Sequence, residues 1–165
     1  MTRVVGDSEQ AVDDFRQLAA AYCELIEGVE GHEADEVTRR LATLLPGLMG
    51  AAERLPRLEP VGEVDAPEIS HKNWSARYAS INALLGSRGE YWTTMDVQAA
   101  EEPEVVNLPI ADDLADIWRD LRGGLDLEAI GGDIADVVWE WRFNYETHWG
   151  SHAVEALRAV HAVLR

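Results

Sequence analysis

The sequence predicts an all-α protein, built as a single domain over residues 1–165 from about five helices in an orthogonal or bundle-like arrangement. Apolar residues recur at three- and four-residue steps in successive segments, which is the period of amphipathic helices. No segment shows a convincing apolar–polar alternation typical of a strand. A chain of 165 residues that is 47% hydrophobic is large enough to bury one core.

Two helices are expected in the first third of the chain. The first covers residues 8–28, where Asp7 or Ser8 can cap the amino end. The second covers residues 33–54, and Pro46 falls inside its apolar pattern. Because the apolar stripe continues in phase beyond the proline, the pattern favours one kinked helix over two separate pieces.

The middle of the chain combines a third helix with exposed connections. Residues 56–68 are rich in proline and acidic residues, which indicates a connection on the surface. Ser70 is a suitable N-cap for a helix that ends near Gly86. We expect residues 91–95 to form a turn of helix or an irregular packed segment, and residues 100–107 to form an acidic loop.

The last two helices hold most of the unusual residues. The fourth is expected from about Pro109 or Ala111 to Gly123–Gly124, since proline suits a first turn and glycine suits a helix end. The fifth is expected over residues 132–164. Its apolar residues occupy two neighbouring sectors of the helical wheel, an arc too wide for a surface helix. This long C-terminal helix is therefore expected to be central and covered on more than one side.

Charged residues accompany the apolar stripes of both helices. A row of carboxylates lies along one edge of the fourth helix, and it consists of Asp113, Asp116 and Asp120. Like charges on a buried edge require cations opposite them, and Arg142, His148 and His152 are the candidates. Arg142 and Glu146 are four residues apart, so they are expected to form a partly buried pair.

This predicted buried polar network has two interpretations. One is a structural set of ion pairs and hydrogen bonds that fixes how the last two helices dock. The other is a metal site, because His148 and His152 are four residues apart and place both rings on one side of a helix. With a carboxylate such as Asp116 they could hold a divalent ion for binding or for metal-dependent hydrolysis. Neither an H-E-x-x-H motif nor the paired E-x-x-H motif of di-iron bundles is present.

The net charge of −17 is the strongest statement about partners. It argues against nucleic acid and anionic membranes as ligands, since both attract clustered Lys and Arg. Acidic residues concentrate in the middle of the chain, and an acidic surface for a basic protein partner is expected there. Its members are Asp96, Glu101, Glu102, Glu104, Asp112, Asp126, Glu128, Asp133 and Asp136.

Other motifs of function are missing from the sequence. We find no phosphate-binding loop, dinucleotide fingerprint, nucleophile elbow or zinc–cysteine pattern, so no cofactor is predicted. The single cysteine, Cys23, lies in an apolar run and is expected to be a buried, inert thiol. With no apolar run long enough to span a bilayer, these features predict a cytoplasmic protein.

Two blocks near the C-terminus resemble a known family. They are D-D-L-A-D-I-W-R-D-L-R-G-G-L (112–125) and W-E-W-R-F-N-Y-E-T-H-W-G-S-H-A-V-E-A-L-R-A-V-H (139–161). They resemble the bacterial family catalogued as domain of unknown function 5063, whose opening is also similar to residues 14–27. The resemblance implies a small helical bacterial protein and supplies no catalytic residue.

The sequence therefore favours a non-enzymatic interaction module that binds a basic protein through its acidic surface. The immunity or antitoxin half of a bacterial toxin pair is one protein of this kind. A metal-binding protein or metal-dependent hydrolase is the alternative.

Overall fold

The computed structural model describes residues 2–62, 64–98 and 101–165, and these are mainly helical. The elements are α1 (Thr2–Glu27), α2 (Ala34–Arg54), α3 (His71–Leu85), β1 (Glu90–Thr94), β2 (Val105–Pro109), α4 (Ile110–Ala129), α5 (Ile134–Asn144) and α6 (Gly150–Val163). Short 3₁₀ turns follow α1 and α3, and a π-helical turn over Tyr145–Trp149 joins α5 to α6. The predicted all-α class is confirmed, and α5, the π-helical turn and α6 together correspond to the predicted fifth helix, with a small hairpin added.

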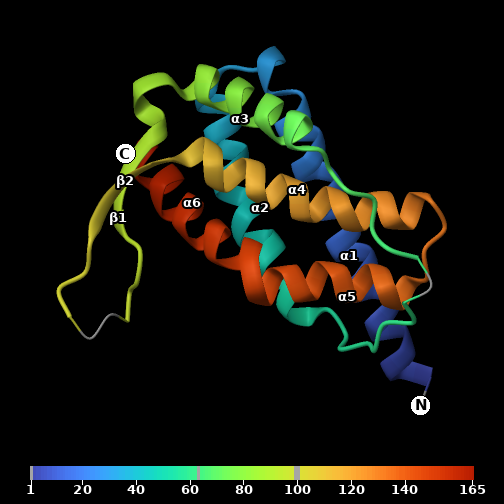
Figure 1. The fold of residues 1–165 in the computed structure, drawn as a ribbon. Helices are drawn as coiled ribbons and strands as arrows, with labels where there is room; N and C mark the ends of the chain where they lie inside the picture. The colour runs from blue at the N-terminus through green and yellow to red at the C-terminus, as the bar shows by residue number, and fades with distance from the viewer. Residues whose placement is uncertain (1, 63, 99–100) are drawn as a thin grey trace.

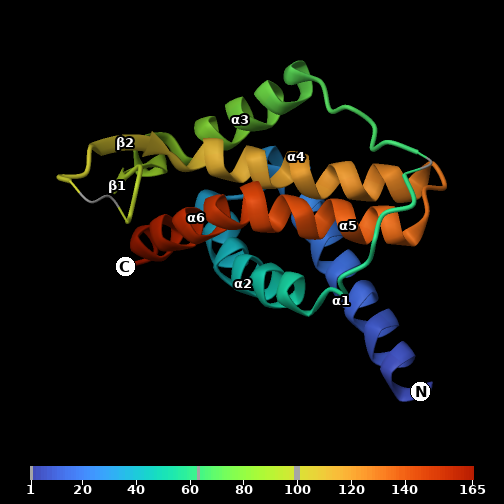
Figure 2. The ribbon, with the colours of Figure 1, turned by 60° about the horizontal axis from the view of Figure 1, so that its bottom comes forward.

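Helix α4 is flanked on most sides. It packs against α1, α3, α5 and α6. Figures 1 and 2 show α3 on one side of α4 and the rod formed by α5 and α6 on the other. This arrangement explains why α4 is buried almost continuously over its first nine residues, Ile110 to Trp118.

The C-terminal rod supplies the largest buried side chains. Trp141 and Trp149 are fully buried and both pack on Phe15 of α1, at ring-centre distances of 5.0 and 6.2 Å. The face predicted from the helical wheel is therefore in the core over most of its length. The neighbouring sector differs from the prediction, because Phe143 is 46% exposed and Leu164 is 37% exposed.

Several predicted helix ends agree with the structure and two do not. Ser70 caps α3 by accepting a hydrogen bond from the Asn73 N–H at 3.2 Å, and Pro109 directly precedes α4. Helix α2 runs through Pro46 as one helix. Helix α1 begins six residues earlier than predicted, and α4 continues past Gly123–Gly124 to Ala129. The two glycines are buried inside α4 rather than at its end.

The segment between α3 and α4 was predicted to lack strands, and this prediction is wrong. Strands β1 and β2 form an antiparallel hairpin in which Trp92 is opposite Asn107 and Thr94 is opposite Val105. Both views show the hairpin extending from one end of the helical body, next to α6. Among the described residues, no helix is long and apolar enough to cross a membrane.

Candidate metal centre

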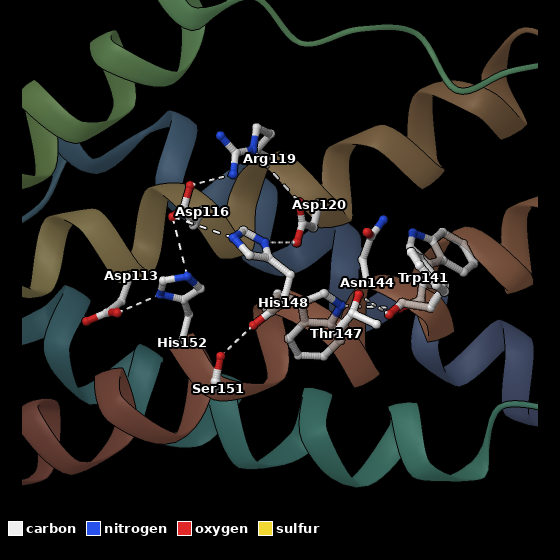
Figure 3. Close-up of polar contacts among 12 residues, drawn as sticks. Asp113, Asp116, Arg119, Asp120, Trp141, Asn144, Thr147, His148, Ser151 and His152 are labelled. Atoms are coloured by element: carbon white, nitrogen blue, oxygen red, sulfur yellow. Dashed lines mark hydrogen bonds and ion pairs between the residues drawn. The ribbon is translucent and has the colours of Figure 1, made fainter. Parts of the chain in front are cut away.

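The carboxylate row of α4 faces two histidines of the C-terminal rod. Figure 3 shows the ring of His148, from the π-helical turn, and the ring of His152, from α6, directed toward α4. We call this group the Asp–His seam, and it consists of Asp113, Asp116, Asp120, His148 and His152. Asp113 and Asp116 are buried, whereas the His148 side chain is 37% exposed. The seam is thus held inside the fold on one side and reaches solvent on the other.

Each histidine is fixed through its Nδ1 atom by a different carboxylate. His148 Nδ1 lies 2.6 Å from Asp120 Oδ2, and His152 Nδ1 lies 2.8 Å from Asp113 Oδ1. An imidazole that donates its Nδ1–H to a carboxylate leaves the lone pair on Nε2. The two hydrogen bonds therefore orient both rings and favour the tautomer whose Nε2 can act as a ligand.

Both Nε2 atoms point toward one oxygen of Asp116. His152 Nε2 lies 3.4 Å from Asp116 Oδ2, and His148 Nε2 lies 3.9 Å from the same oxygen. These distances exceed those of ordinary hydrogen bonds. The potential ligand atoms of the three residues all lie within 4.8 Å of one another.

Other side chains hold the second oxygen of Asp116 and the far oxygen of Asp113. Trp74 Nε1 donates to Asp116 Oδ1 at 2.9 Å, and Arg119 Nη2 lies 2.8 Å from the same oxygen. The Tyr91 hydroxyl donates to Asp113 Oδ2 at 2.6 Å. Elements α3, β1 and α4 itself therefore all contribute to keeping the row in place.

Burial and charge act in opposite directions on the groups of the seam. The pKa of His152 is raised, chiefly by its hydrogen bond to Asp113 and against the effect of burial. The pKa of Asp120 is also raised, because burial outweighs its hydrogen bond to His148. The pKa of Asp112, half-buried beside the row, is raised by burial and by repulsion from Asp116 and Asp113. Burial therefore disfavours the charged forms of Asp120 and Asp112, and a nearby cation would offset this effect.

Arg142 lies elsewhere, contrary to its predicted place opposite the carboxylate row. Its Nη1 donates to the backbone carbonyl groups of Leu55, at 2.7 Å, and Ala52, at 3.3 Å, at the end of α2. Its Nε lies 3.0 Å from Glu146 Oε1, so the expected pair forms, although without hydrogen-bond alignment. Glu146 is exposed rather than buried. The cation beside the row is instead Arg119, which is three residues from Asp116 on the same helix.

The predicted acidic surface is not one surface. Asp136 is buried and accepts the Val61 and Gly62 N–H groups at 2.6 and 2.9 Å, so it anchors the connection after α2. Asp133 caps α5. Asp126 and Glu128 pair with Arg122 and Arg16, respectively. Asp133 is exposed at the start of α5, and the other exposed members, Asp96, Glu101, Glu102 and Glu104, lie in the hairpin and its loop.

Three residues that contact the Asp–His seam were not predicted from the sequence. Trp74 and Tyr91 belong to segments far from the row in sequence, so only the fold reveals them. Arg119 could have been found, because the i, i+3 spacing from Asp116 on a helix is a recognised pairing distance.

These features describe a small helical protein in which a carboxylate row on one helix faces a histidine pair on the next rod. The chain belongs to the family described as domain of unknown function DUF5063, since the profile of that family matches residues 7–165. The resemblance seen in the sequence is thereby confirmed.

The fold also occurs in a solved structure. Protein BF1032 from Bacteroides fragilis is similar over 94% of this chain and 92% of its own, with a TM-score of 0.81 and 22% sequence identity. At this level of identity the likeness establishes a shared fold and nothing about activity. A comparison with curated proteins finds no match.

Proposed function

We propose that the Asp–His seam binds a divalent transition-metal ion through His148 Nε2, His152 Nε2 and Asp116 Oδ2. The observation that carries the proposal is the convergence of these atoms on one point, while each Nδ1 is held by a separate carboxylate. A histidine ligand typically donates its other ring N–H to a carboxylate or carbonyl group, which orients the ring and makes it a better ligand. Two histidines and one carboxylate are a donor set suited to zinc, iron(II) or manganese(II).

The spacing of the three atoms supports an ion between them. Two ligand atoms bound to zinc at about 2.0–2.1 Å, at a tetrahedral angle, are about 3.4 Å apart. Asp116 Oδ2 is 3.4 Å from His152 Nε2 and 3.9 Å from His148 Nε2, and the ligand atoms of all three residues lie within 4.8 Å of one another, which is wider than the ideal zinc spacing. Small side-chain adjustments would therefore complete the site. Three protein ligands leave coordination positions for water or a substrate, as in catalytic rather than structural sites.

Charge balance supports the same conclusion. The three carboxylates of the row carry three negative charges when ionised, and Arg119 supplies one positive charge. With neutral histidines the seam has an excess of two negative charges, which one divalent ion balances. Two protonated histidines would also balance it, and this state corresponds to the structural network.

The two states differ in how they depend on protons. A metal must displace the ring protons of its histidine ligands, so its affinity falls as the histidines become protonated. A structural network instead uses those protons to dock the rod onto α4. Because the hydrogen bond to Asp113 raises the pKa of His152, protonation of this ring is expected to compete with metal binding.

The test is metal binding to tag-free protein that has been stripped with chelator. We expect zinc or manganese to bind with one ion per chain in calorimetry, with a rise in melting temperature. His152→Ala and Asp116→Asn should weaken zinc binding by at least about a hundredfold, because each removes a direct ligand. Asp113→Asn and Asp120→Asn should weaken it about ten- to a hundredfold, because they only orient the rings.

The matched controls are the histidines outside the seam. His32→Ala and His161→Ala remove a histidine without touching α4, so they should leave zinc affinity unchanged. Circular dichroism checks that each variant folds. The proposal is wrong if the stripped protein binds no ion stoichiometrically, or if the control variants lose as much affinity as His152→Ala.

A further inference from the structure

The β1–β2 hairpin is attached to the helical body by one face. Tyr91 hydrogen-bonds to Asp113 of α4, and the Thr93 hydroxyl donates to Glu155 of α6 at 2.9 Å. Because side chains alternate along a strand, the residues between them point to the opposite face. Trp92 and Asn107 are opposite each other on that outer face, and Thr94 is opposite Val105.

The outer face and the adjoining loop expose large apolar side chains. Trp92 is 64% exposed and Val105 is 61% exposed. Met95 and Val97, where the chain leaves β1, are 68% and 81% exposed, and they line a pocket on the inner side of the hairpin together with Thr93 and His152. Single exposed apolar residues are common, but several together on one projecting element indicate an interaction site. A tryptophan in such a place is the residue type most enriched among those that dominate binding energy.

The same hairpin is strongly acidic. Residues 90–109 contain five acidic side chains, Glu90, Asp96, Glu101, Glu102 and Glu104, and no Lys, Arg or His. All five are exposed. Exposed apolar side chains and five acidic side chains thus occupy one element that has no basic residue of its own.

The combination of exposed apolar and acidic side chains on the hairpin limits which kinds of partner can bind there. A second copy of the hairpin, nucleic acid or an anionic membrane would each bring like charge against the acidic side chains. A cationic segment without apolar side chains would leave Trp92 and its neighbours exposed. We propose that the outer face of the hairpin docks a basic protein segment in which cationic and apolar side chains alternate. This proposal is independent of the metal site. It assigns binding of a basic partner to residues 90–109 alone, and not to the whole predicted acidic surface.

The test uses synthetic peptides of defined chemistry and the full chain. A labelled peptide about ten residues long with alternating Arg and Leu should bind, as measured by fluorescence anisotropy. Matched Arg/Ser and Glu/Leu peptides should bind at least about tenfold more weakly, since each lacks one half of the complementarity. Affinity for the Arg/Leu peptide should fall as salt rises from about 50 to 300 mM.

Variants locate the binding. Trp92→Ala should weaken binding of the Arg/Leu peptide at least about tenfold, whereas Phe143→Ala, an exposed aromatic residue on α5, should not. The triple change of Glu101, Glu102 and Glu104 to Gln should weaken binding and flatten its salt dependence. The same change at Glu9, Glu24 and Glu33 is the charge control.

Three outcomes would overturn the proposal. They are no binding of the Arg/Leu peptide, equal binding of the Arg/Ser peptide, and equal loss in the hairpin and control variants. Binding of the unmodified protein to anionic vesicles would likewise reject a protein segment as the occupant. Unchanged melting temperatures of all variants confirm that the comparison is made between folded proteins. Since the metal ligands are not altered, failure here leaves the metal proposal standing.

Discussion

Helix α4 contacts the C-terminal rod in two regions of opposite character, one apolar and one made of ionisable side chains. Near Gly124 the contact is dry, and the Trp141 indole lies directly on the helix backbone, where its Nε1 donates to the Leu121 carbonyl at 3.2 Å. One to three turns away, the Asp–His seam fills the same interface with ionisable groups. Close packing at the dry contact fixes the distance between α4 and the C-terminal rod. At that distance the side chains of the Asp–His seam fit between the two.

The dry contact should be the more sensitive to a single methyl group. A Cβ atom at Gly124 would lie 2.7 Å from Trp141 Cε2 and closer still to Nε1. Gly124→Ala should therefore destabilise the protein by about 2 kcal/mol through overpacking, or about 4–8 °C in melting temperature. Urea unfolding with and without zinc measures the effect.

The adjacent glycine is the control for this prediction. At Gly123 the nearest atom to an added Cβ is Glu140 Oε1, at 3.9 Å. Gly123→Ala should be tolerated, and it should stabilise α4 by about 0.5–1 kcal/mol because glycine is a poor helix former. Equal losses at the two positions would show that helix composition, and not contact with Trp141, determines the effect.

These two glycines also show what the sequence predicts poorly. A Gly–Gly pair usually marks a helix end, and the predicted helix therefore ended there. In the structure both glycines lie inside α4, and Gly124 is needed there because Trp141 packs directly against it. The hairpin was missed for a related reason. Its outer face carries Trp92 and Val105, so the alternation that identifies a strand is masked by apolar residues on both faces.

The helices and the seam were more accessible to sequence reasoning. Their signals are local, because apolar steps of three and four residues and the His148–His152 spacing lie within single segments. The partner of Arg142 and the roles of Trp74 and Tyr91 depend on contacts between segments far apart in the chain. The π-helical turn carries no sequence signal except Gly150.

Gly150 links the π-helical turn to the geometry of the seam. Its N–H donates to the carbonyl of Tyr145, five residues earlier, and an added Cβ would collide with that carbonyl oxygen. Gly150→Ala should therefore shift the turn, cost about 1–2 kcal/mol, and weaken zinc binding about tenfold as His148 moves relative to His152. Calorimetry and urea unfolding measure the two effects.

Val154→Ala is the control for the turn, since Val154 is exposed on α6 outside it. It should change neither stability nor zinc affinity appreciably. If Gly150→Ala lowers stability but leaves zinc affinity intact, the π-helical turn does not position His148 for the metal.

The smallest expected effect is on the pH dependence of the free energy of unfolding, to which the polar seam should contribute and the dry contact should not. Because the pKa of His152 is raised in the folded protein, its protonation contributes stability that is complete below about pH 6.5, the ordinary histidine value. This contribution is lost as the pH rises through the raised pKa. Without metal, the free energy of unfolding should fall as the pH rises above about 6.5, and His152→Gln should remove that part of the slope. With saturating zinc the slope should flatten or reverse, because deprotonation favours the metal.

Gly123→Ala should keep the wild-type slope, since it alters only the dry end of the interface. A slope that is the same in His152→Gln and wild type would mean that the proton on this ring contributes nothing to docking the rod.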